Sequence, residues 1–313
     1  MSVRSEELFP DISGAAPAVI GSYGESPRGY RLPGALRLGA VRLQIADLAR
    51  SLAYYTGTLG LKLLSRDGAV VTLGTADGEL LVELNERAGA IPRPSRGRTG
   101  LYHFAILLPD RASLGRFVRH LADSGVQAGA GDHLVSEAFY LTDPDGLGIE
   151  IYADRPRESW QRVGRELRMA TDPVDVADVV RSAGDAKWTG MPAGTQMGHL
   201  HLQVGDVSRA AAFYSEALGF DRTVWSYPGA LFFSAGGYHH HLGTNTWAGN
   251  GARPAAEHEA QLLEWTVVLP LVSDVEAVGA SLTAGGFSFV RTGKAIVARD
   301  PWETSVRIQA REG

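Results

Sequence analysis

The strongest constraint on the fold of this chain is an internal repeat. Residues 39–61 and 198–220 align without a gap at an offset of 159, and nine of the 23 aligned positions are identical. A second pair of segments repeats between them, because Tyr102–Pro109 matches Leu263–Pro270. Self-similarity of this kind indicates one supersecondary unit used several times. The chain therefore divides into four units of roughly sixty residues each, starting near residues 36, 98, 196 and 260.

Each unit predicts the same succession of elements. In the first unit Val41, Leu43 and Ile45 alternate with other side chains, which is typical of a strand with one buried face. Asp47 then stands at the N-cap position of a helix, and Gly60 suits the left-handed conformation that ends one. Three short strands complete the unit. The sequence therefore predicts an α+β protein of four βαβββ modules.

Composition limits the function. The 313 residues are 44% hydrophobic and 21% charged, as in an ordinary globular protein with room for two domains. The net charge of −5 and the lack of a long basic run exclude nucleic acid as the expected partner. We see no apolar run near twenty residues and no secretion signal, so we expect a cytoplasmic protein without a membrane span. With no cysteine, any metal must be bound by histidine and carboxylate.

The repeat also sets the expected domain boundaries. Residues 1–35, which are rich in proline and glycine, are predicted to form an N-terminal arm over the surface. Modules 1 and 2 make a first half over residues 36–155, and modules 3 and 4 a second half over residues 196–313. Residues 156–195 between them are predicted to be a linker. We expect both the arm and the linker to serve only as connections.

Chemistry is concentrated in residues 131–150, whose pattern is G-x-H-x5-F-Y-x2-D-P-x-G-x3-E. The last residue, Glu150, lies within the apolar run that follows the tight turn at Asp143. A carboxylate that faces a protein core costs several kcal/mol unless it is paired, about 2–7 even for milder polar groups. A metal ion is a common partner for such a group. The block therefore indicates a metal site.

Taken together, this block and the fourfold βαβββ repeat resemble the vicinal oxygen chelate superfamily. The block itself looks like the signature of the type I extradiol dioxygenases, and within that group the chain is most similar to the two-half bacterial catechol 2,3-dioxygenases over residues 36–311. The resemblance implies two open mixed-sheet barrels, each made from two modules. It also implies the catabolic, Fe(II)-dependent cleavage of catechol, or a substituted catechol, by O2 to a 2-hydroxymuconic semialdehyde.

The resemblance further implies a ligand set of one histidine on the first strand of each paired module and one glutamate on a last strand. His103 and Glu150 of module 2 and His199 of module 3 match these positions. The corresponding positions in modules 1 and 4 are unsuitable: Ala40, Glu264 and Arg307. We therefore expect modules 2 and 3 to form the active barrel and modules 1 and 4 to form a structural one. Whether modules 2 and 3 pair within one chain or between two chains stays open.

Three further residues acquire expected roles from the resemblance. His240, in the segment Gly236–Gly243, matches the acid–base catalyst, and we expect its neighbours His239 and His241 to point to the opposite strand face. Tyr140 and His133 match groups that contact the metal-bound substrate oxygen. By itself, a run of three histidines can equally be an incidental surface cluster. The roles of His201, His239 and His241 stay open.

Two other function classes compete with the dioxygenase. One is a glyoxalase-like isomerase or lyase that uses the metal only as a Lewis acid, and the other is a metal-free, drug-sequestering protein of the same fold. Fe(II) is the expected metal, with Mn(II) as the alternative, and the expected assembly is a homodimer. The aromatic residues that could line a pocket for an aromatic diol are Trp160, Trp225, Tyr227, Phe233 and Trp247.

Overall fold

The computed structural model describes residues 3–10 and 13–311. Its α-helices are α1 (Ser5–Leu8), α2 (Leu48–Ala53), α3 (Arg111–Asp123), α4 (Val176–Ser182), α5 (Val207–Ala210) and α6 (Val272–Ala284). Its other helical segments are η1 (Tyr54–Thr58), η2 (Arg157–Ser159) and η3 (Ala211–Ala217). Its strands are β1 (Ala15–Pro17), β2 (Arg37–Ile45), β3 (Lys62–Asp67), β4 (Val70–Gly74), β5 (Leu80–Glu86), β6 (Gly100–Leu107), β7 (Gly129–Asp132), β8 (Ser136–Thr142), β9 (Gly148–Asp154), β10 (Gln161–Val163), β11 (Glu166–Leu167), β12 (Gln196–Gln203), β13 (Asp221–Val224), β14 (Ala230–Ser234), β15 (Leu242–Asn245), β16 (Gln261–Leu269), β17 (Phe289–Thr292), β18 (Ala295–Arg299) and β19 (Ser305–Ala310).

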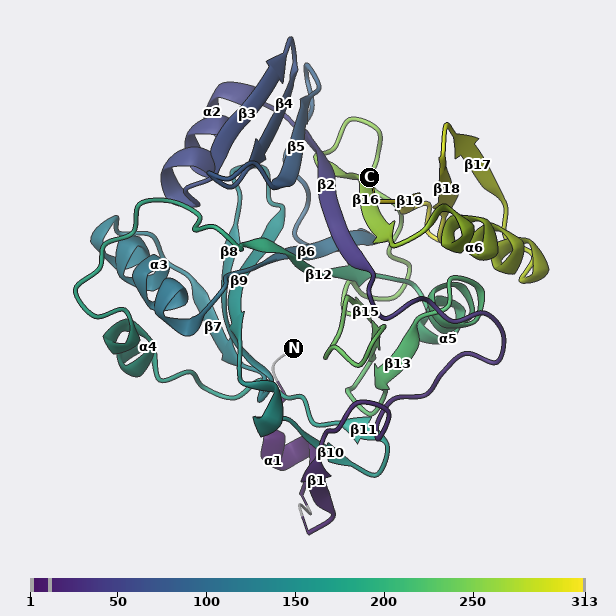
Figure 1. The fold of residues 1–313 in the computed structure, drawn as a ribbon. Helices are drawn as coiled ribbons and strands as arrows, with labels where there is room; N and C mark the ends of the chain where they lie inside the picture. The colour runs from purple at the N-terminus through teal and green to yellow at the C-terminus, as the bar shows by residue number, and fades with distance from the viewer. Residues whose placement is uncertain (1–2, 11–12, 312–313) are drawn as a thin grey trace.

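Two eight-stranded mixed sheets form the body of the protein (Figure 1). One has the order β13-β14-β15-β12-β6-β9-β8-β7 and so joins the strands of modules 3 and 2. The other has the order β17-β18-β19-β16-β2-β5-β4-β3 and joins the strands of modules 4 and 1. In each sheet the two modules meet through an antiparallel pair of first strands, β6 with β12 and β2 with β16. The predicted α+β class with four βαβββ modules is confirmed, and in each sheet both modules belong to the same chain.

The helices of modules 1 and 3 begin as the sequence predicts but continue differently. Asp47 accepts a hydrogen bond from the backbone N–H of Arg50 at 2.8 Å, and Asp206 does the same for Arg209. Both helices then widen into π-helical turns, η1 and η3, where a regular α-helix was expected. Such widening rotates the following side chains around the helix axis. Here the wider turns carry a buried tyrosine in each module.

These two tyrosines hold the Asp-Pro turns of the neighbouring modules. The Tyr55 hydroxyl donates to Asp143 at 3.1 Å, and the Tyr214 hydroxyl donates to Asp300 at 2.8 Å. Each aspartate also accepts two backbone N–H groups of its own turn; for Asp143 these belong to Asp145 and Leu147. Buried polar groups need such partners. The Asp-Pro turns therefore have a structural role that is common to both sheets.

The arm and the linker do more than connect the two halves. Strand β1 of the arm pairs with β10 of the linker, and β10 pairs with β11, giving a three-stranded sheet at the bottom of Figure 1. Residues of both segments also share a second hydrophobic cluster with the β13–β14 hairpin, including Val3, Trp160, Met169 and Tyr227. This cluster closes one end of the sheet formed by modules 2 and 3. The expectation that these segments are only connections was therefore wrong.

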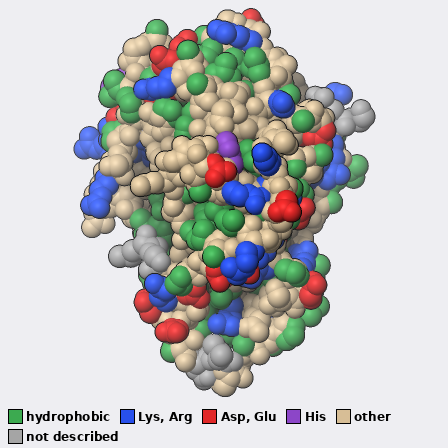
Figure 2. Space-filling model, turned by 90° about the vertical axis from the view of Figure 1, so that its left-hand side faces the viewer, with side chains coloured by type: hydrophobic (Ala, Val, Ile, Leu, Met, Phe, Trp, Pro, Cys, Tyr) green, Lys and Arg blue, Asp and Glu red, His purple; other side chains and the backbone are tan. Residues whose placement is uncertain are grey.

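The distribution of charge on the surface and the length of the helices agree with the mild net charge and the short apolar runs of the sequence. On the face shown in Figure 2, basic and acidic side chains are intermixed, without a large region of one sign. Among the described residues no helix is long and apolar enough to span a membrane.

Candidate metal centre

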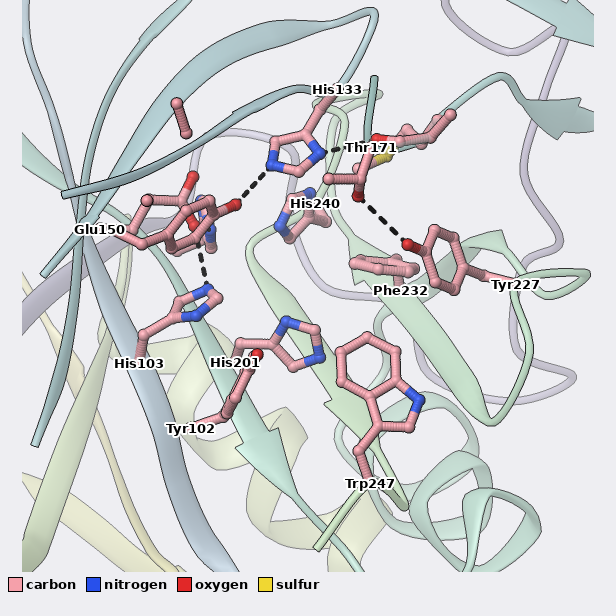
Figure 3. Close-up of a pocket in the computed structure, with 16 residues that line it drawn as sticks. Tyr102, His103, His133, Glu150, Thr171, His201, Tyr227, Phe232, His240 and Trp247 are labelled. Carbon is pink, nitrogen blue, oxygen red and sulfur yellow. Dashed lines mark hydrogen bonds and ion pairs between the residues drawn. The ribbon is translucent and has the colours of Figure 1, made fainter. Parts of the chain in front are cut away.

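A cavity of about 280 Å³ lies against the sheet of modules 2 and 3 (Figure 3). The structure brings all six predicted site residues to it: His103 on β6, Glu150 on β9, His199 on β12, Tyr140 on β8, His133 in the β7–β8 loop and His240 in the turn before β15. Their roles remain predictions, but their common location is a fact of the fold. Residues spread over 138 positions of sequence, from 103 to 240, meet here.

Strand register places the three candidate ligands on one face. Ala105 pairs with Glu150 across the parallel β6–β9 ladder and with His199 across the antiparallel β6–β12 ladder. Paired residues project from the same face of a sheet, and so does His103, two residues before Ala105. Since Ala105 is the smallest side chain of this group, it leaves space between the two rings and the carboxylate.

The ligand atoms converge without a full set of partners. Glu150 Oε2 lies 3.0 Å from His103 Nε2 and 3.2 Å from His199 Nε2, and one ligand atom from each residue lies within 4.8 Å of the others. All three side chains are buried. His103 Nε2, Glu150 Oε1 and His199 Nδ1 have no hydrogen-bond partner. Buried polar atoms without partners are rare and need an explanation.

The charge states suit a divalent cation. Burial lowers the pKa of His199 to about 4, in spite of the nearby Glu150 carboxylate. Burial would raise the pKa of Glu150, but His199 and His103 outweigh it and hold this pKa well below its usual range. The site therefore offers an ionised carboxylate and a neutral imidazole, and metal ligands must be deprotonated in this way. Two histidines and one carboxylate match the set used by non-haem Fe(II) oxygenases.

Tyr140 and His133 form a hydrogen-bonded pair at the cavity wall. His133 Nδ1 lies 2.7 Å from the carbonyl oxygen of Ala170, which can only accept, so this nitrogen carries a proton. In the neutral ring Nε2 is then the acceptor for the Tyr140 hydroxyl, with which it makes a short hydrogen bond. Burial, followed by the charge of Glu150, raises the pKa of Tyr140 well above its usual range. Tyr140 is therefore held as a neutral phenol next to the ligand set.

The three consecutive histidines lie in a turn and not in the strand. Strand β15 begins only at Leu242, so the strand alternation expected for His239 and His241 does not apply. His240 lines the cavity, with its ring centroid 4.1 Å from that of His199, and burial lowers its pKa well below the usual range. The His239 side chain does not point away from that of His240, because His239 Nδ1 and His240 Nδ1 lie 2.7 Å apart. His241 points elsewhere, toward Ser234.

The aromatic part of the cavity was predicted only in part. Tyr227 and Trp247 line it, but Phe233 and Trp160 are buried in the two cores and Trp225 packs against the main core. Residues that sequence reasoning did not assign complete the wall: Tyr102, Phe232, His201 and, from the linker, Met169, Ala170 and Thr171. Gly243 faces His201, and a Cβ there would lie 2.9 Å from the ring. The alternation of His199 and His201 was the one sequence signal for His201.

Comparison with known proteins defines the class of protein. The model of the Glyoxalase/Bleomycin resistance protein/Dioxygenase superfamily matches residues 37–151 and 196–306. The chain belongs to this superfamily, as the resemblance predicted.

Individual relatives narrow the comparison. The chain is 46% identical to the catechol-2,3-dioxygenase of Bacillus subtilis (strain 168) over 269 residues. The aligned residues make up 84% of this chain and 93% of that protein. Glyoxalase I of Zea mays is similar in structure with a TM-score of 0.53 and 20% identity, covering 88% of this chain and 92% of that chain. A proposed dioxygenase from Bacillus subtilis subsp. subtilis str. 168 has a TM-score of 0.63 at 14% identity, covering 91% and 87%. Both solved structures share the fold.

Proposed function

We propose that this protein cleaves the ring of a catechol with O2, next to the two hydroxyl groups, and releases a 2-hydroxymuconic semialdehyde. The enzyme class, an extradiol ring-cleaving dioxygenase, rests on the 46% identity to a catechol-2,3-dioxygenase over most of the chain. The observation that carries the proposal is the ligand set, in which His103, His199 and Glu150 converge with unpartnered atoms at a cavity. We propose Fe(II) as the metal and these three residues as its ligands.

The metal would bind both reactants, the diol and O2. His103, His199 and Glu150 would hold the metal, and Fe(II) would supply the redox chemistry between a catechol and O2. The residues present fit this group, because one ligand atom of each lies within 4.8 Å of the others, and His103 Nε2 and Glu150 Oε1 are buried without a hydrogen-bond partner. A single carboxylate also keeps the total charge of such a centre at about +1 before substrate binds.

The residues around the ligand set bind and orient the substrate. The Tyr140 oxygen is held by His133 beside Glu150, so it can contact a hydroxyl oxygen of the diol. His240 lines the cavity beside His199 and, as a neutral imidazole, can take a proton from a diol hydroxyl and return it later. Trp247 and Phe232 supply apolar walls that exclude water from the ring.

The cavity also favours a particular kind of catechol. None of the described residues that line it is a lysine or an arginine, so a carboxylate on the ring would be desolvated without a partner. Its volume of about 280 Å³ is at the small end of the range for ligand pockets. We therefore propose a single-ring catechol whose substituents are small and uncharged.

The test is anaerobic reconstitution with Fe(II), followed by addition of catechol and air. We expect O2 uptake, one O2 per ring, together with the yellow ring-fission product, for catechol and 4-methylcatechol and much less for 3,4-dihydroxybenzoate. His240→Ala should keep its metal and lose about 10²–10⁴ of kcat. Metal binding without O2 uptake by any of these diols would favour the isomerase class. A wild-type protein that binds no Fe(II) or Mn(II) would contradict the proposed site.

A further inference from the structure

A chain of hydrogen bonds runs from the cavity to the surface behind His240. His240 Nδ1 lies 2.7 Å from His239 Nδ1, and His239 Nε2 lies 3.0 Å from Asp154 Oδ1. His239 and His240 are both buried, whereas the Asp154 side chain is 28% exposed. Asp154 follows Glu150 by four residues on β9, so the two carboxylates project from the same face of that strand.

Donor and acceptor rules fix the direction of these bonds. An ionised carboxylate can only accept, so His239 Nε2 must carry the proton in its bond to Asp154. In a neutral His239 ring Nδ1 is then a bare acceptor. Two imidazole nitrogens 2.7 Å apart need one donor between them, so the proton must be on His240 Nδ1. His240 Nε2, the nitrogen left for a ligand in the cavity, is consequently bare.

From this geometry we infer that Asp154 is a positioning residue that, acting through His239, selects the tautomer of His240 with a bare Nε2 facing the cavity. The inference rests on the proposed function for its consequence, since a bare Nε2 is the form that can accept a proton from a diol hydroxyl. The number of protons on Asp154, His239 and His240 is the same for either tautomer of His240. Asp154 chooses which nitrogen of His240 holds the one proton present.

A second donor keeps Asp154 in place. The Tyr238 hydroxyl donates to the same Asp154 oxygen at 3.1 Å, and the hydroxyls of Tyr238 and Tyr152 lie 2.8 Å apart. The Tyr152 ring packs against His199, with centroids 4.8 Å apart. The carboxylate that selects the tautomer is therefore anchored to the same layer of side chains that carries a candidate ligand.

The tautomer can be observed without any turnover. In protein labelled with ¹⁵N-histidine and loaded with diamagnetic Zn(II), the two ring nitrogens of a neutral histidine have well-separated ¹⁵N shifts, and His239→Gln and His240→Gln variants assign the signals. We expect His240 to be protonated at Nδ1 and His239 at Nε2 in the wild type. Asp154→Ala removes the acceptor, so His240 should become a mixture of tautomers. Wild-type protein with His240 protonated at Nε2 would overturn the inference.

Kinetics of the Fe(II)-loaded variants give the second readout. We expect Asp154→Ala to lower kcat about a hundredfold, with KM and metal content within about threefold of the wild type. Asp154→Asn keeps an acceptor oxygen, so it should retain about ten times more of kcat than the alanine variant. Asp178→Asn changes an exposed aspartate that is ion-paired with Arg111 and Arg181, outside the cavity, and serves as the control, with no change expected.

The two proposals fail in different ways. If Asp154→Ala keeps both the wild-type tautomer and kcat within twofold, the inference about Asp154 is wrong while ring cleavage stands. If the wild type shows the expected tautomers but cleaves no diol, the proposed function is wrong and the selection of the tautomer stands.

Discussion

The two eight-stranded sheets have the same topology but carry different side chains at equivalent positions. One sheet has a candidate set of metal ligands there, and the other has an ion pair. In the sheet of modules 2 and 3, His103, His199 and Glu150 meet with unpartnered atoms. The equivalent positions in the sheet of modules 4 and 1 are occupied by Glu264, Ala40 and Arg307. There Arg307 pairs with Glu264 at 2.7 Å, so the position of the metal ligands holds an ion pair.

Two more residues complete this ion-pair cluster. Arg42 lies 2.8 Å from Glu83 and 3.6 Å from Glu264, so two arginines and two glutamates balance one another. Arg42 and Glu83 correspond in register to His201 and Gly243 of the other sheet. In one sheet a glycine leaves space for the ring at the cavity, and in the other a glutamate fills that space. A charged side chain on the buried face of either sheet therefore needs a partner, which can be a metal ion or another side chain.

The largest expected effect separates the two sheets directly. Glu150→Gln removes the only carboxylate of the ligand set and should weaken metal binding about a hundredfold or more, beyond the effect of losing an outer contact. Arg307→Met, at the equivalent position, should leave metal content unchanged and cost about 1–3 kcal/mol of stability, because Glu264 loses its nearest partner and keeps only Arg42 at 3.6 Å. Metal analysis and urea unfolding measure both. Equal metal loss in the two variants would remove the distinction between the sheets.

Metal removal should sharpen the same contrast. A metal at one hundred times its Kd stabilises the folded state by about 2.7 kcal/mol, which a chelator takes away. We expect this loss in the wild type and in Arg307→Met, and its absence in Glu150→Gln. Thermal unfolding with and without chelator gives the measurement, and a chelator shift that survives in Glu150→Gln would place the metal elsewhere.

The Asp-Pro turns test what the sheets share. Burial raises the pKa of Asp143 to about 6, and burial also raises that of Asp300. Since the folded-state pKa of Asp143 exceeds the unfolded value of about 3.9, the folded protein holds the proton more tightly, and stability falls as pH rises from about 4 to 6. Asp143→Asn removes this dependence, so its stability relative to the wild type should improve by on the order of 2–3 kcal/mol across that window.

The matched variant Asp300→Asn should change in the same direction, because the Tyr214–Asp300 pair repeats the Tyr55–Asp143 pair. Unfolding by urea at pH 4, 5, 6 and 7 measures both. A pH dependence that differs in sign between the two variants would show that the turns are not equivalent.

The smallest effect should be equal in the two halves. Asp47→Ala and Asp206→Ala each remove one helix N-cap, in which a carboxylate accepts a backbone N–H at 2.8 Å. Each variant should lose about 1 kcal/mol of stability, with no change in bound metal. A loss in one variant more than twice that in the other would show that the repeated helices are stabilised differently.

Much of this protein was readable from the sequence. The repeat of residues 39–61 at an offset of 159 predicted the four modules, since each copy carries the same alternation, cap and helix-ending glycine. Composition without cysteine limited any metal to histidine and carboxylate, and Glu150 in an apolar strand pointed to a counter-charge. These patterns depend on residues that are close together in the sequence, so a single sequence was enough to find them.

The tertiary structure decided what depends on contacts between distant segments. The linker supplies Met169 and Ala170 to the cavity wall, although nothing in its local pattern distinguishes it from a connection. The Asp154 contact with His239 spans 85 residues, and the ion pair between Arg42 and Glu264 joins modules 1 and 4. Sequence patterning fixes which face of a strand a side chain takes, but its partner across space is set only when the sheets and loops pack together.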